Sequence, residues 1–376
     1  RLSAWFVGAI LVITALTGLV WSQIAPDQVL WICLAVLVVS CPCALALATP
    51  AALTAAASAL RAQGVIVHGE NAIEALAHAQ RVVFDKTGTL TQGKLRLETV
   101  SACGEVNDAF LTELATALQQ HSNHPIAHAF TGTAITGISE PRYITGAGIE
   151  ASWNGQRYRM GSERFCRELA PTLPNAPNNE LYWVALCSSD QPLAWFGLSD
   201  PLRPEAAEVV AAARSAGMSL ALLTGDSSSA GARLGRELGF DFVSTGLSPE
   251  DKMQQVRAWQ EAGEVVMAVG DGLNDAPLLG LANASFAVAS ATDLARAQAD
   301  FVVDDDNLNA VIRSLTKARQ CVRIIRQNFV WALSYNGLGI PLAALGYIPP
   351  WAAALGMSVS SLIVVMNSLR LNRTQP

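Results

Sequence analysis

Long apolar runs occupy both ends of the chain, and a middle region in which polar and apolar residues alternate separates them. Four of the runs contain no charged residue: residues 4–21, 29–48, 329–345 and 351–369. About 20 apolar residues suffice for a helix to cross a bilayer, so the pattern predicts four membrane-spanning helices. The turn within each pair of runs lacks Lys and Arg, whereas Arg61 and Arg370 stand at the opposite ends. This asymmetry predicts that the middle region lies in the cytoplasm.

The middle region alternates short β-prone stretches with segments of helical spacing. The expected strands are residues 82–84, 219–223, 265–269 and 301–303. The expected helices between them are residues 204–216, 228–238 and 249–262. Strands that alternate with helices are typical of a doubly wound parallel sheet, which is the predicted core of this region.

Residues 93–198 break this pattern and are predicted to form a second domain inserted into the first. Helices are expected at residues 108–120 and 125–136, and strands within residues 143–160 and 181–198. The predicted domains are two membrane helices with a cytoplasmic extension (1–69), an α/β domain in two pieces (70–92 and 199–320), the insertion (93–198) and two C-terminal membrane helices (321–376).

Composition narrows the classes of protein and partner. Of 376 residues, 51% are hydrophobic and only 15% are charged, which is too apolar for a protein without membrane segments. The net charge of −6, without a basic block, argues against nucleic acid as a partner. Seven scattered cysteines do not predict a disulfide framework. The chain starts at Arg1 rather than Met, directly before an apolar run, which predicts an N-terminal truncation.

The predicted strand at residues 82–84 runs directly into the heptapeptide Asp-Lys-Thr-Gly-Thr-Leu-Thr at residues 85–91. Open α/β sheets bind ligands at the carboxyl edge of their strands, which is where Asp85 is expected. A carboxylate at such a place can act as a nucleophile and form an acyl phosphate. Lys86, Thr87 and Gly88 supply a positive charge, a hydroxyl and a flexible backbone for phosphate oxygens.

Two further strand ends carry chemistry at the same predicted edge. Residues 219–223 run into Thr224, Gly225 and Asp226, where a hydroxyl and a glycine can hold a phosphate oxygen. Alone, this motif is as typical of an ordinary turn as of a phosphate-binding site. Residues 265–269 run into Gly-Asp-Gly-Leu-Asn-Asp, a more specific pattern. Carboxylates at a strand end suit Mg²⁺, so Asp271 is the expected ligand, with Asn274 and Asp275 supporting the loop.

Two other segments fit the same edge less specifically. Lys252 follows a helix start, Ser-Pro-Glu-Asp, and can reach a phosphoryl group, although a helical Lys usually faces solvent. Asp200 and Arg203, in Asp-Pro-Leu-Arg, form a turn before a helix.

These motifs, in this order, resemble those of P-type ATPases, the pumps that pass through an aspartyl phosphate. The resemblance implies that Asp85 is phosphorylated, that Thr224 and Lys252 hold the phosphoryl group, and that Asp200 and Arg203 belong to a hinge. The residues implied in catalysis are Asp85, Lys86, Thr87, Thr224, Gly225, Asp226, Lys252 and Asp275, and those implied in Mg²⁺ binding are Asp85, Thr87 and Asp271.

The implied fold is an α/β haloacid dehalogenase-like phosphorylation domain with an inserted α+β nucleotide-binding domain, attached to an α-helical transmembrane bundle. Haloacid dehalogenase-like phosphatases usually carry a second Asp two positions after the nucleophile, where this chain has Thr87. Because that acid serves proton transfer during hydrolysis, its absence favours a site that keeps its phosphate.

The insertion resembles the ATP-binding domain of heavy-metal pumps. His-Ser-Asn-His-Pro at residues 121–125 is similar to their Ser-Glu-His-Pro motif, which implies that His124 stacks against adenine. Gly146 and Gly148 are similar to their Gly-x-Gly motif, and Gly161 to a further glycine beside the nucleotide. The motif's Glu is Asn123 here, and Gln119 stands where the family often has an acid that contacts adenine, so that role is left unassigned.

Cys41, Pro42 and Cys43 lie inside the second apolar run. Pro42 removes the helix hydrogen bond to the carbonyl of Val38, so a loosened turn can direct both sulfurs inward. Soft thiolates select Cu(I) over hard divalent ions. Cys-Pro-Cys also resembles the metal signature of heavy-metal P-type ATPases.

The last two runs indicate the metal. Residues 329–369 contain no Asp, Glu, Lys or Arg, whereas zinc, cadmium and lead pumps place a Lys or Asp there. Tyr335, Asn336, Met357 and Ser361 are similar to the ligands of the copper(I) branch, which implies a copper site shared with the two cysteines. The sequence around Met357 also resembles the subgroup that supplies copper for cytochrome oxidase assembly.

The expected function is ATP-driven export of Cu(I), or of Ag(I), through an aspartyl phosphate, with ATP and Mg²⁺ as cofactors and a copper chaperone as donor. The expected location is a bacterial inner membrane. The alternatives are a divalent zinc, cadmium or lead pump, a membrane-anchored phosphatase and a non-catalytic metal-binding membrane protein. The Thr-Gly-Glu loop with which these pumps dephosphorylate is absent from the sequence, so the chain is expected to form the phosphoenzyme poorly or to stall in it, and not to pump alone.

Overall fold

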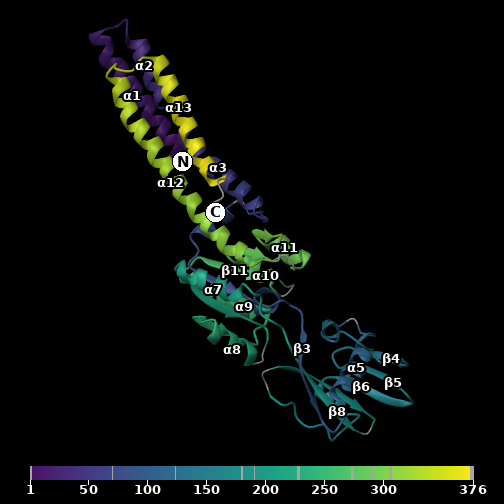
Figure 1. Cartoon of the computed structure of the whole chain (residues 1–376). Coiled ribbons are helices and arrows are strands. Elements are labelled where there is room, and N and C mark those ends of the chain that lie inside the picture. The colour runs from purple at the N-terminus through teal and green to yellow at the C-terminus, as the bar shows by residue number, and fades with distance from the viewer. Residues whose placement is uncertain are drawn as a thin grey trace. The chain divides into compact units, whose positions relative to one another are not determined.

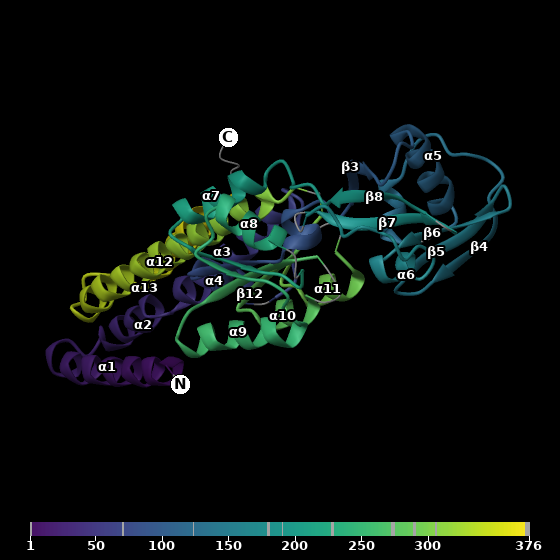
Figure 2. The same cartoon turned by 90° about the horizontal axis from the view of Figure 1, so that it is seen from below.

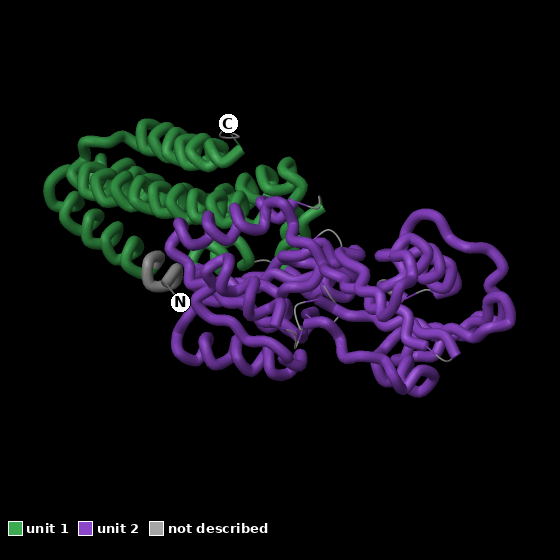
Figure 3. Tube along the Cα trace, turned by 60° about the horizontal axis from the view of Figure 1, so that its bottom comes forward, with its two compact units in different colours: residues 1–78, 300–304, 310–376 green, residues 79–299, 305–309 purple. Residues whose placement is uncertain are grey.

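The computed structural model describes residues 2–69, 71–122, 124–178, 181–189, 191–226, 229–271, 275–288, 291–304 and 307–372. The chain divides into two compact units (Figure 3). The first contains residues 1–78, 300–304 and 310–376, and the second contains residues 79–299 and 305–309. This division does not test the four predicted domains, whose boundaries stay a prediction.

The first unit is built mainly from helices that run side by side (Figures 1 and 2). They are α1 (Leu2–Ile24), α2 (Val29–Val39), α3 (Cys43–Arg61), α12 (Asn309–Ala344) and α13 (Pro350–Ser368). Among the described residues, Val29–Arg61 and Pro350–Asn372 are long and apolar enough to cross a membrane, and Gly8–Ile24 is a shorter apolar helix. The predicted run at residues 329–345 forms the C-terminal half of α12.

Small side chains let these helices approach one another closely. Ala44 and Ala48 of α3, Ala332 of α12 and Val364 of α13 form one buried cluster. Close approach of this kind gives helices in a bilayer the van der Waals packing on which their association depends. Short elements complete the unit, namely α4 (Ala72–Ala77), η3 (Leu369–Asn372) and the antiparallel strands β1 (Val65–Val67) and β13 (Phe301–Val303).

The second unit contains a parallel sheet with the strand order β12-β11-β2-β9-β10. The strands are β2 (Arg81–Phe84), β9 (Ser219–Leu223), β10 (Phe242–Ser244), β11 (Val266–Gly270) and β12 (Ala284–Ala287). Helices α7 (Ala206–Ser215) and α8 (Ser229–Glu237) cover one face, and α9 (Pro249–Glu261) and α10 (Ala276–Leu281) cover the other (Figure 2). Helix α11 (Asp293–Gln298) follows β12. The predicted doubly wound sheet is confirmed.

Strand β2 lies at the centre of this sheet, between β9 and β11. Val82, Val83 and Phe84 are fully buried, as expected for a strand covered on both faces. After β2 the chain builds the sheet outward through β9 and β10, and then returns to build it on the other side through β11 and β12. The carboxyl end of β2 is therefore the switch point, where open α/β sheets bind their ligands.

The insertion forms a six-stranded antiparallel sheet in the order β3-β8-β7-β6-β5-β4. Its strands are β3 (Arg96–Ala102), β4 (Ser139–Ile144), β5 (Gly148–Trp153), β6 (Gln156–Gly161), β7 (Tyr182–Ser188) and β8 (Pro192–Ser199). Along β7, Val184 and Leu186 face a core shared with α5 (Asp108–Gln119), whereas Ala185 and Cys187 face a second core shared with α6 (Glu163–Arg167). This alternation is the period of a strand buried on both faces.

The predicted helix at residues 125–136 is wrong. Only a short 3-10 turn, η2 (Pro125–Ala129), forms there, and residues 130–138 have no regular structure. Gly132 adopts a φ of +118°, which a helix cannot contain, and two β-branched threonines flank it. Strand β3 was not predicted, because its residues are mostly polar and partly exposed.

The core between α5 and this sheet gives a stability prediction. We expect Leu114→Ala, at a fully buried position, to lower the free energy of unfolding by about 2–5 kcal/mol, because the lost methyl groups leave a cavity. Val106→Ala, at a position that is 37% exposed, should cost less than about 1 kcal/mol. Urea unfolding in detergent, followed by the fluorescence of Trp153, Trp183 and Trp195, would measure both, and equal losses would contradict this packing.

Candidate active site

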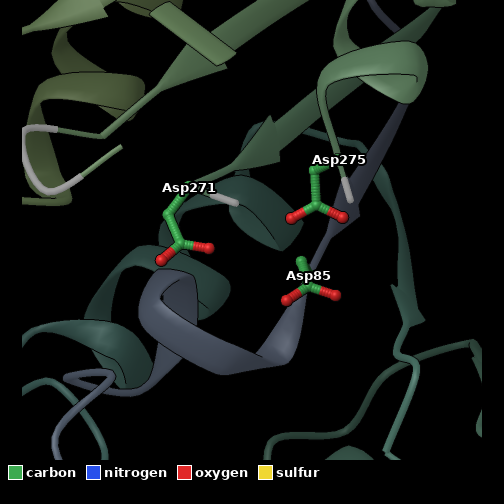
Figure 4. Close-up of side chains that lie close together, drawn as sticks. All are labelled: Asp85, Asp271 and Asp275. Carbon is green, nitrogen blue, oxygen red and sulfur yellow. The ribbon is translucent and has the colours of Figure 1, made fainter. Parts of the chain in front are cut away.

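Three neighbouring strands deliver polar residues to one edge of the parallel sheet. Asp85 follows β2, Thr224 follows β9 and Asp271 follows β11. Asp275 comes from the start of α10, immediately beyond β11. Figure 4 shows the carboxylates of Asp85, Asp271 and Asp275 turned toward one another, and oxygen atoms of all three lie within 4.8 Å of one another. The sequence predicted this convergence from the strand ends.

Lys252 lies in the same cluster. Its Nζ donates to Asp85 Oδ1 at 2.6 Å and to Asp275 Oδ1 at 2.8 Å. The three side chains are almost inaccessible to solvent, with exposed fractions of 4% for Lys252, 6% for Asp85 and 2% for Asp275. The predicted reach of Lys252 into the site is therefore present in the structure, with a carboxylate on either side of its ammonium group.

Local sequence explains why Lys252 points inward. Ser248 caps α9 by accepting a hydrogen bond from Asp251 N at 3.2 Å, and the Asp251 side chain accepts one in return from Ser248 N at 3.0 Å. Pro249 occupies the first turn, where its missing N–H costs nothing. This reciprocal cap fixes where α9 begins, and Lys252 follows it directly, on the buried face of the first turn.

Crowded negative charge controls the protonation of this cluster. Burial and the nearby carboxylate of Asp275 raise the pKa of Asp85 to about 6, although Lys252 opposes the shift. Burial and the carboxylate of Asp85 raise the pKa of Asp271 to about 7. Burial would lower the pKa of Lys252, but Asp85 and Asp275 together raise it above its ordinary value. Lys252 is thus held as a cation, while the cluster attracts further positive charge.

The turn after β2 explains the glycine of the heptapeptide. Thr87 N donates to Asp85 Oδ2 at 2.9 Å, which begins the turn η1 (Lys86–Leu90). Gly88 has a φ of +70°, and a Cβ atom built on it would lie 1.6 Å from Asp271 Oδ2. Only glycine therefore allows this turn to pass against the Asp271 carboxylate.

The returning chain holds this turn from the other side. Thr91 Oγ1 donates to Asp200 Oδ2 at 2.6 Å, and Arg203 Nη2 donates to the carbonyl of Gly88 at 2.9 Å. Arg203 N also donates to the carbonyl of Leu90 at 2.9 Å. Asp200 and Arg203 lie where the chain re-enters the parallel sheet after the insertion. They tie that crossing to the turn after β2, a role that the local turn pattern did not reveal.

The motif after β9 contributes a second pair of charges. Thr224 is buried, and its Oγ1 accepts a hydrogen bond from Asp226 N at 3.1 Å. Asp226 in turn forms an ion pair with Lys86. Gly225 lies near the carbonyl of Leu247, which would be 3.3 Å from a Cβ atom built on the glycine. The structure thus connects the predicted residues Lys86 and Asp226, which lie far apart in the sequence.

The residues of this edge fit a hard divalent cation. Lys252 contacts two of the three clustered carboxylates, those of Asp85 and Asp275, and carboxylate oxygens are the ligands that Mg²⁺ prefers. Asp85 and Asp271 are the residues that would hold the cation, which would neutralise phosphate oxygens next to Asp85. Asn274, which was predicted to support this loop, lies outside the described residues.

A cavity in the insertion contains all four predicted nucleotide residues. His124, Gly146, Gly148 and Gly161 line it, together with Tyr143, Ser162 and Tyr182 among others. His124 Nδ1 accepts a hydrogen bond from Ile126 N at 3.2 Å, so the neutral ring carries its hydrogen on Nε2. The rings of His124 and Tyr143 lie 6.4 Å apart with an interplanar angle of 32°.

Close strand contact explains two of the glycines. A Cβ atom on Gly148 would lie 2.2 Å from the carbonyl oxygen of Met160, and one on Gly161 would lie 2.1 Å from that of Ala147. Gly146 has a φ of +73° and open space around it. Gly148 and Gly161 therefore let β5 and β6 meet, whereas Gly146 leaves room at the cavity wall.

Gln119 is the residue that sequence reasoning left unassigned. Its side chain is 6% exposed and lines the same cavity, and its Nε2 donates to Met160 Sδ at 3.4 Å. Its Oε1 has no hydrogen-bond partner among the described residues. A buried acceptor without a partner costs free energy, so a donor such as the amino group of a base would satisfy it. The sequence feature that could have placed Gln119 in this cavity was its position five residues before His124.

The first unit brings some of the predicted metal ligands together. The helix breaks at residues 40–42, between α2 and α3, where Cys41 N donates to the carbonyl of Val38 at 3.3 Å. Cys43 Sγ lies 4.0 Å from Met357 Sδ on α13. Cys41 and Cys43 are bonded to each other as a disulfide, so metal binding by both sulfurs would require their reduction.

Two further predicted ligands lie on α12. Tyr335 Oη lies 2.8 Å from a Cβ atom built on Gly356, next to Met357, so this hydroxyl reaches α13. Asn336 is buried. Ser361 lies one turn beyond Met357 on α13. No contact that joins Asn336 or Ser361 to the sulfur atoms is seen among the described residues, and their assignment stays a prediction.

The charge cluster predicts how stability responds to loss of its cation. We expect Lys252→Met to lower the free energy of unfolding by about 3–5 kcal/mol at pH 8, because two buried carboxylates lose their partner. Without the ammonium group, which opposes the upward shift, the folded-state pKa of Asp85 rises further above its unfolded value. Because the folded state then binds more protons, stability falls as pH rises, and the loss should be smaller at pH 5.

Chemical unfolding at both pH values would measure this loss. Lys94→Met, at an exposed position, is the matched control and should change stability by less than about 0.5 kcal/mol at either pH. A loss for Lys252→Met that is independent of pH would contradict the proposed charge balance.

Comparison with known proteins gives a family and close relatives. A family profile for haloacid dehalogenase-like hydrolases matches residues 80–283, more than half of the chain. The nitrogen fixation protein FixI of Rhizobium leguminosarum bv. viciae is 38% identical over 361 residues, which cover 94% of this chain and 46% of that protein. The probable copper-exporting P-type ATPase V of Mycobacterium tuberculosis H37Rv is 35% identical, covering 99% of this chain and 50% of that protein.

The structural comparison agrees with these matches. The crystal structure of a zinc-transporting PIB-type ATPase in its E2.Pi state has a TM-score of 0.86 and 31% identity, covering 99% of this chain and 63% of that one. The chain spans about half the length of the curated relatives that it matches. The chain therefore belongs to the haloacid dehalogenase-like hydrolases, and along nearly its whole length it is similar to heavy-metal P-type ATPases.

Proposed function

We propose that this chain is the catalytic and ion-binding part of an ATP-driven pump that exports Cu(I), or Ag(I), across a membrane through an aspartyl phosphate. The observation that carries the proposal is the meeting of Cys43 Sγ and Met357 Sδ, 4.0 Å apart on two helices of the membrane bundle. Once the Cys41–Cys43 disulfide is reduced, the Cys43 thiolate and the Met357 thioether are soft ligands that favour a monovalent copper ion. The same chain carries a buried nucleophile cluster at Asp85.

The chemistry at Asp85 is phosphoryl transfer. An oxygen of the ionised Asp85 carboxylate attacks the γ-phosphorus of ATP, a new P–O bond forms, the bond to the bridging β-phosphate oxygen breaks, and ADP leaves. Lys252, 2.6 Å from the nucleophile, stabilises the charge that develops on the phosphoryl oxygens. Thr224 supplies a buried hydroxyl at the same sheet edge.

Thr87 supports storage of the phosphate rather than rapid hydrolysis. A phosphatase of this fold needs a second carboxylate to activate water, and the residue two positions after the nucleophile is Thr87. The side chain at this position can donate and accept hydrogen bonds but cannot serve as a general base. A membrane-anchored phosphatase is therefore the weaker hypothesis.

The cavity of the insertion supports ATP as the phosphoryl donor. The His124 ring at its rim can stack on adenine, and Gly146 leaves room for the base to enter. The unpartnered Oε1 of Gln119 is an acceptor for the amino group of adenine. The hydrogen bond from Gln119 Nε2 to Met160 Sδ orients the amide so that the oxygen remains available.

A divalent pump is the second candidate, because the solved structure that matches this chain with a TM-score of 0.86 is described as zinc-transporting. A buried divalent ion needs negative countercharge, and residues 329–369 contain no Asp or Glu. Copper(I) with two thiolates needs no such carboxylate. Sulfur ligands and the relative described as a copper exporter support the monovalent ion.

The proposal extends to the setting of the protein. Arg61 and Arg370, at the ends of membrane helices, favour a cytoplasmic position for the second unit. The proposed membrane is a bacterial inner membrane. A copper chaperone is the proposed donor, since free Cu(I) is scarce where thiols are abundant. Metal binding and phosphorylation should be reciprocally coupled, so each should change the affinity for the other.

Asp85→Asn tests the phosphoryl transfer. The chain incubated with γ-³²P-labelled ATP, Mg²⁺ and Ag⁺ under reducing conditions should acquire label that hydroxylamine removes, and Asp85→Asn should reduce it at least about a hundredfold. Asp108→Asn, an exposed acid on α5, is the matched control and should keep the label. Undiminished label on Asp85→Asn would rule out this nucleophile.

Met357→Leu tests the metal site. We expect Ag⁺ but not Zn²⁺ to raise the phosphoenzyme level of the wild-type chain, and Met357→Leu to shift the Ag⁺ response to at least about tenfold higher metal concentration, because a soft ligand is lost. Met366→Leu removes a thioether from an exposed position on the same helix and should leave the response unchanged. Stimulation by Zn²⁺ alone would favour the divalent pump.

A further inference from the structure

A groove on α12 lies outside both sites described above. Its lining combines polar and apolar side chains in order along the helix: Arg323, Arg326, Gln327, Val330, Trp331 and Ser334. Arg323 lies seven residues and Arg326 four residues before Val330, which is helical spacing, so both arginines share a face with Val330. The groove is thus basic at one end and apolar at the other.

The groove has fixed walls. Trp331 Nε1 donates to Ser360 Oγ on α13 at 3.1 Å, which holds the indole in place. Gln327 Oε1 accepts a hydrogen bond from Asn367 Nδ2 at 3.3 Å, also on α13. Val330 nevertheless remains 65% exposed and Trp331 42% exposed in the first unit. The apolar surface is therefore preformed and available.

The basic end lacks countercharge. No ion pair joins Arg323 or Arg326 to a carboxylate within the described part of the chain. The sequence from residue 307 to the C-terminus contains no Asp or Glu at all. The basic residues of the first half of α12 are Arg313, Lys317, Arg319, Arg323 and Arg326. Any anionic partner of Arg323 and Arg326 therefore lies outside residues 307–376.

The position of the groove along α12 matches a membrane boundary. From Arg326 to the end of α12 at Ala344 the helix rises about 27 Å, at 1.5 Å per residue, which is close to the hydrocarbon thickness of about 30 Å. Arg323 and Arg326 would then stand at the headgroup level, and Val330 and Trp331 at the upper acyl chains. Tryptophan is typical of this depth.

We propose that this groove binds an anionic phospholipid of the cytoplasmic leaflet. The two guanidinium groups hold the headgroup phosphate, for which arginine offers paired N–H donors, and one acyl chain lies along Val330 and Trp331. A zwitterionic lipid carries the same phosphate, but its own cationic amine competes with the arginines. The site therefore prefers phosphatidylglycerol over phosphatidylcholine. This proposal does not depend on which metal the protein transports.

Quenching of tryptophan fluorescence by brominated lipids tests the proposal. The chain is reconstituted in phosphatidylcholine vesicles that contain either dibrominated phosphatidylglycerol or dibrominated phosphatidylcholine. We expect stronger quenching by the anionic lipid at equal mole fraction, and loss of this excess in Trp331→Phe. The double variant Arg323→Gln/Arg326→Gln should weaken the preference about tenfold or more.

The control removes the same charge elsewhere. Arg61→Gln/Arg313→Gln changes two exposed basic residues of the first unit outside the groove and should keep most of the excess quenching. Equal loss in both double variants would mean non-specific attraction to a charged surface and would overturn the site. Absence of quenching by either lipid would mean that protein covers the groove and would overturn the lipid site. Displacement by soluble glycerol phosphate would mean a site for free anions and would also overturn the proposal.

Discussion

The rest of the catalytic structure depends on one buried ammonium group shared by two carboxylates. Lys252 donates to Asp85 and Asp275, and all three side chains are nearly excluded from water. Taking each charge out of water costs several kcal/mol, so the cluster persists only because strand ends and a capped helix hold it in close geometry. The parallel sheet supplies that geometry, since β2 lies between β9 and β11. Any fold that moved α9 by one turn would leave two carboxylates unpaired.

The same cluster explains why the turn after β2 has so little freedom. Gly88 passes against the carboxylate of Asp271, where no side chain fits. Arg203 and Asp200 hold this turn where the chain returns from the insertion. The insertion therefore leaves and re-enters the sheet beside Asp85. The returning linker of the insertion is thus tied to the carboxylate edge through Asp200 and Arg203.

The membrane unit follows a different constraint. In a bilayer the helix backbone must satisfy its own hydrogen bonds, so a break at residues 40–42 is tolerated only within a bundle. That break brings Cys43 to Met357 on α13. Small residues at Ala44, Ala48 and Ala332 let the three helices approach closely enough for this meeting. Sulfur chemistry and helix packing thus support the same site.

The sequence by itself determined the strand ends, the parallel sheet and the convergence of Asp85, Thr224 and Asp271 at one edge, because each of these residues follows a short apolar strand of that sheet. The sequence also predicted a flexible turn at Gly88 directly after the strand. Only the tertiary structure decided that Lys86 pairs with Asp226 and that Arg203 donates to the Gly88 carbonyl. It also showed that the Gln119 side-chain oxygen has no partner among the described residues. It also replaced the predicted helix at residues 125–136 with a short turn. These contacts join residues far apart in the chain, and local patterns carry no record of such distances.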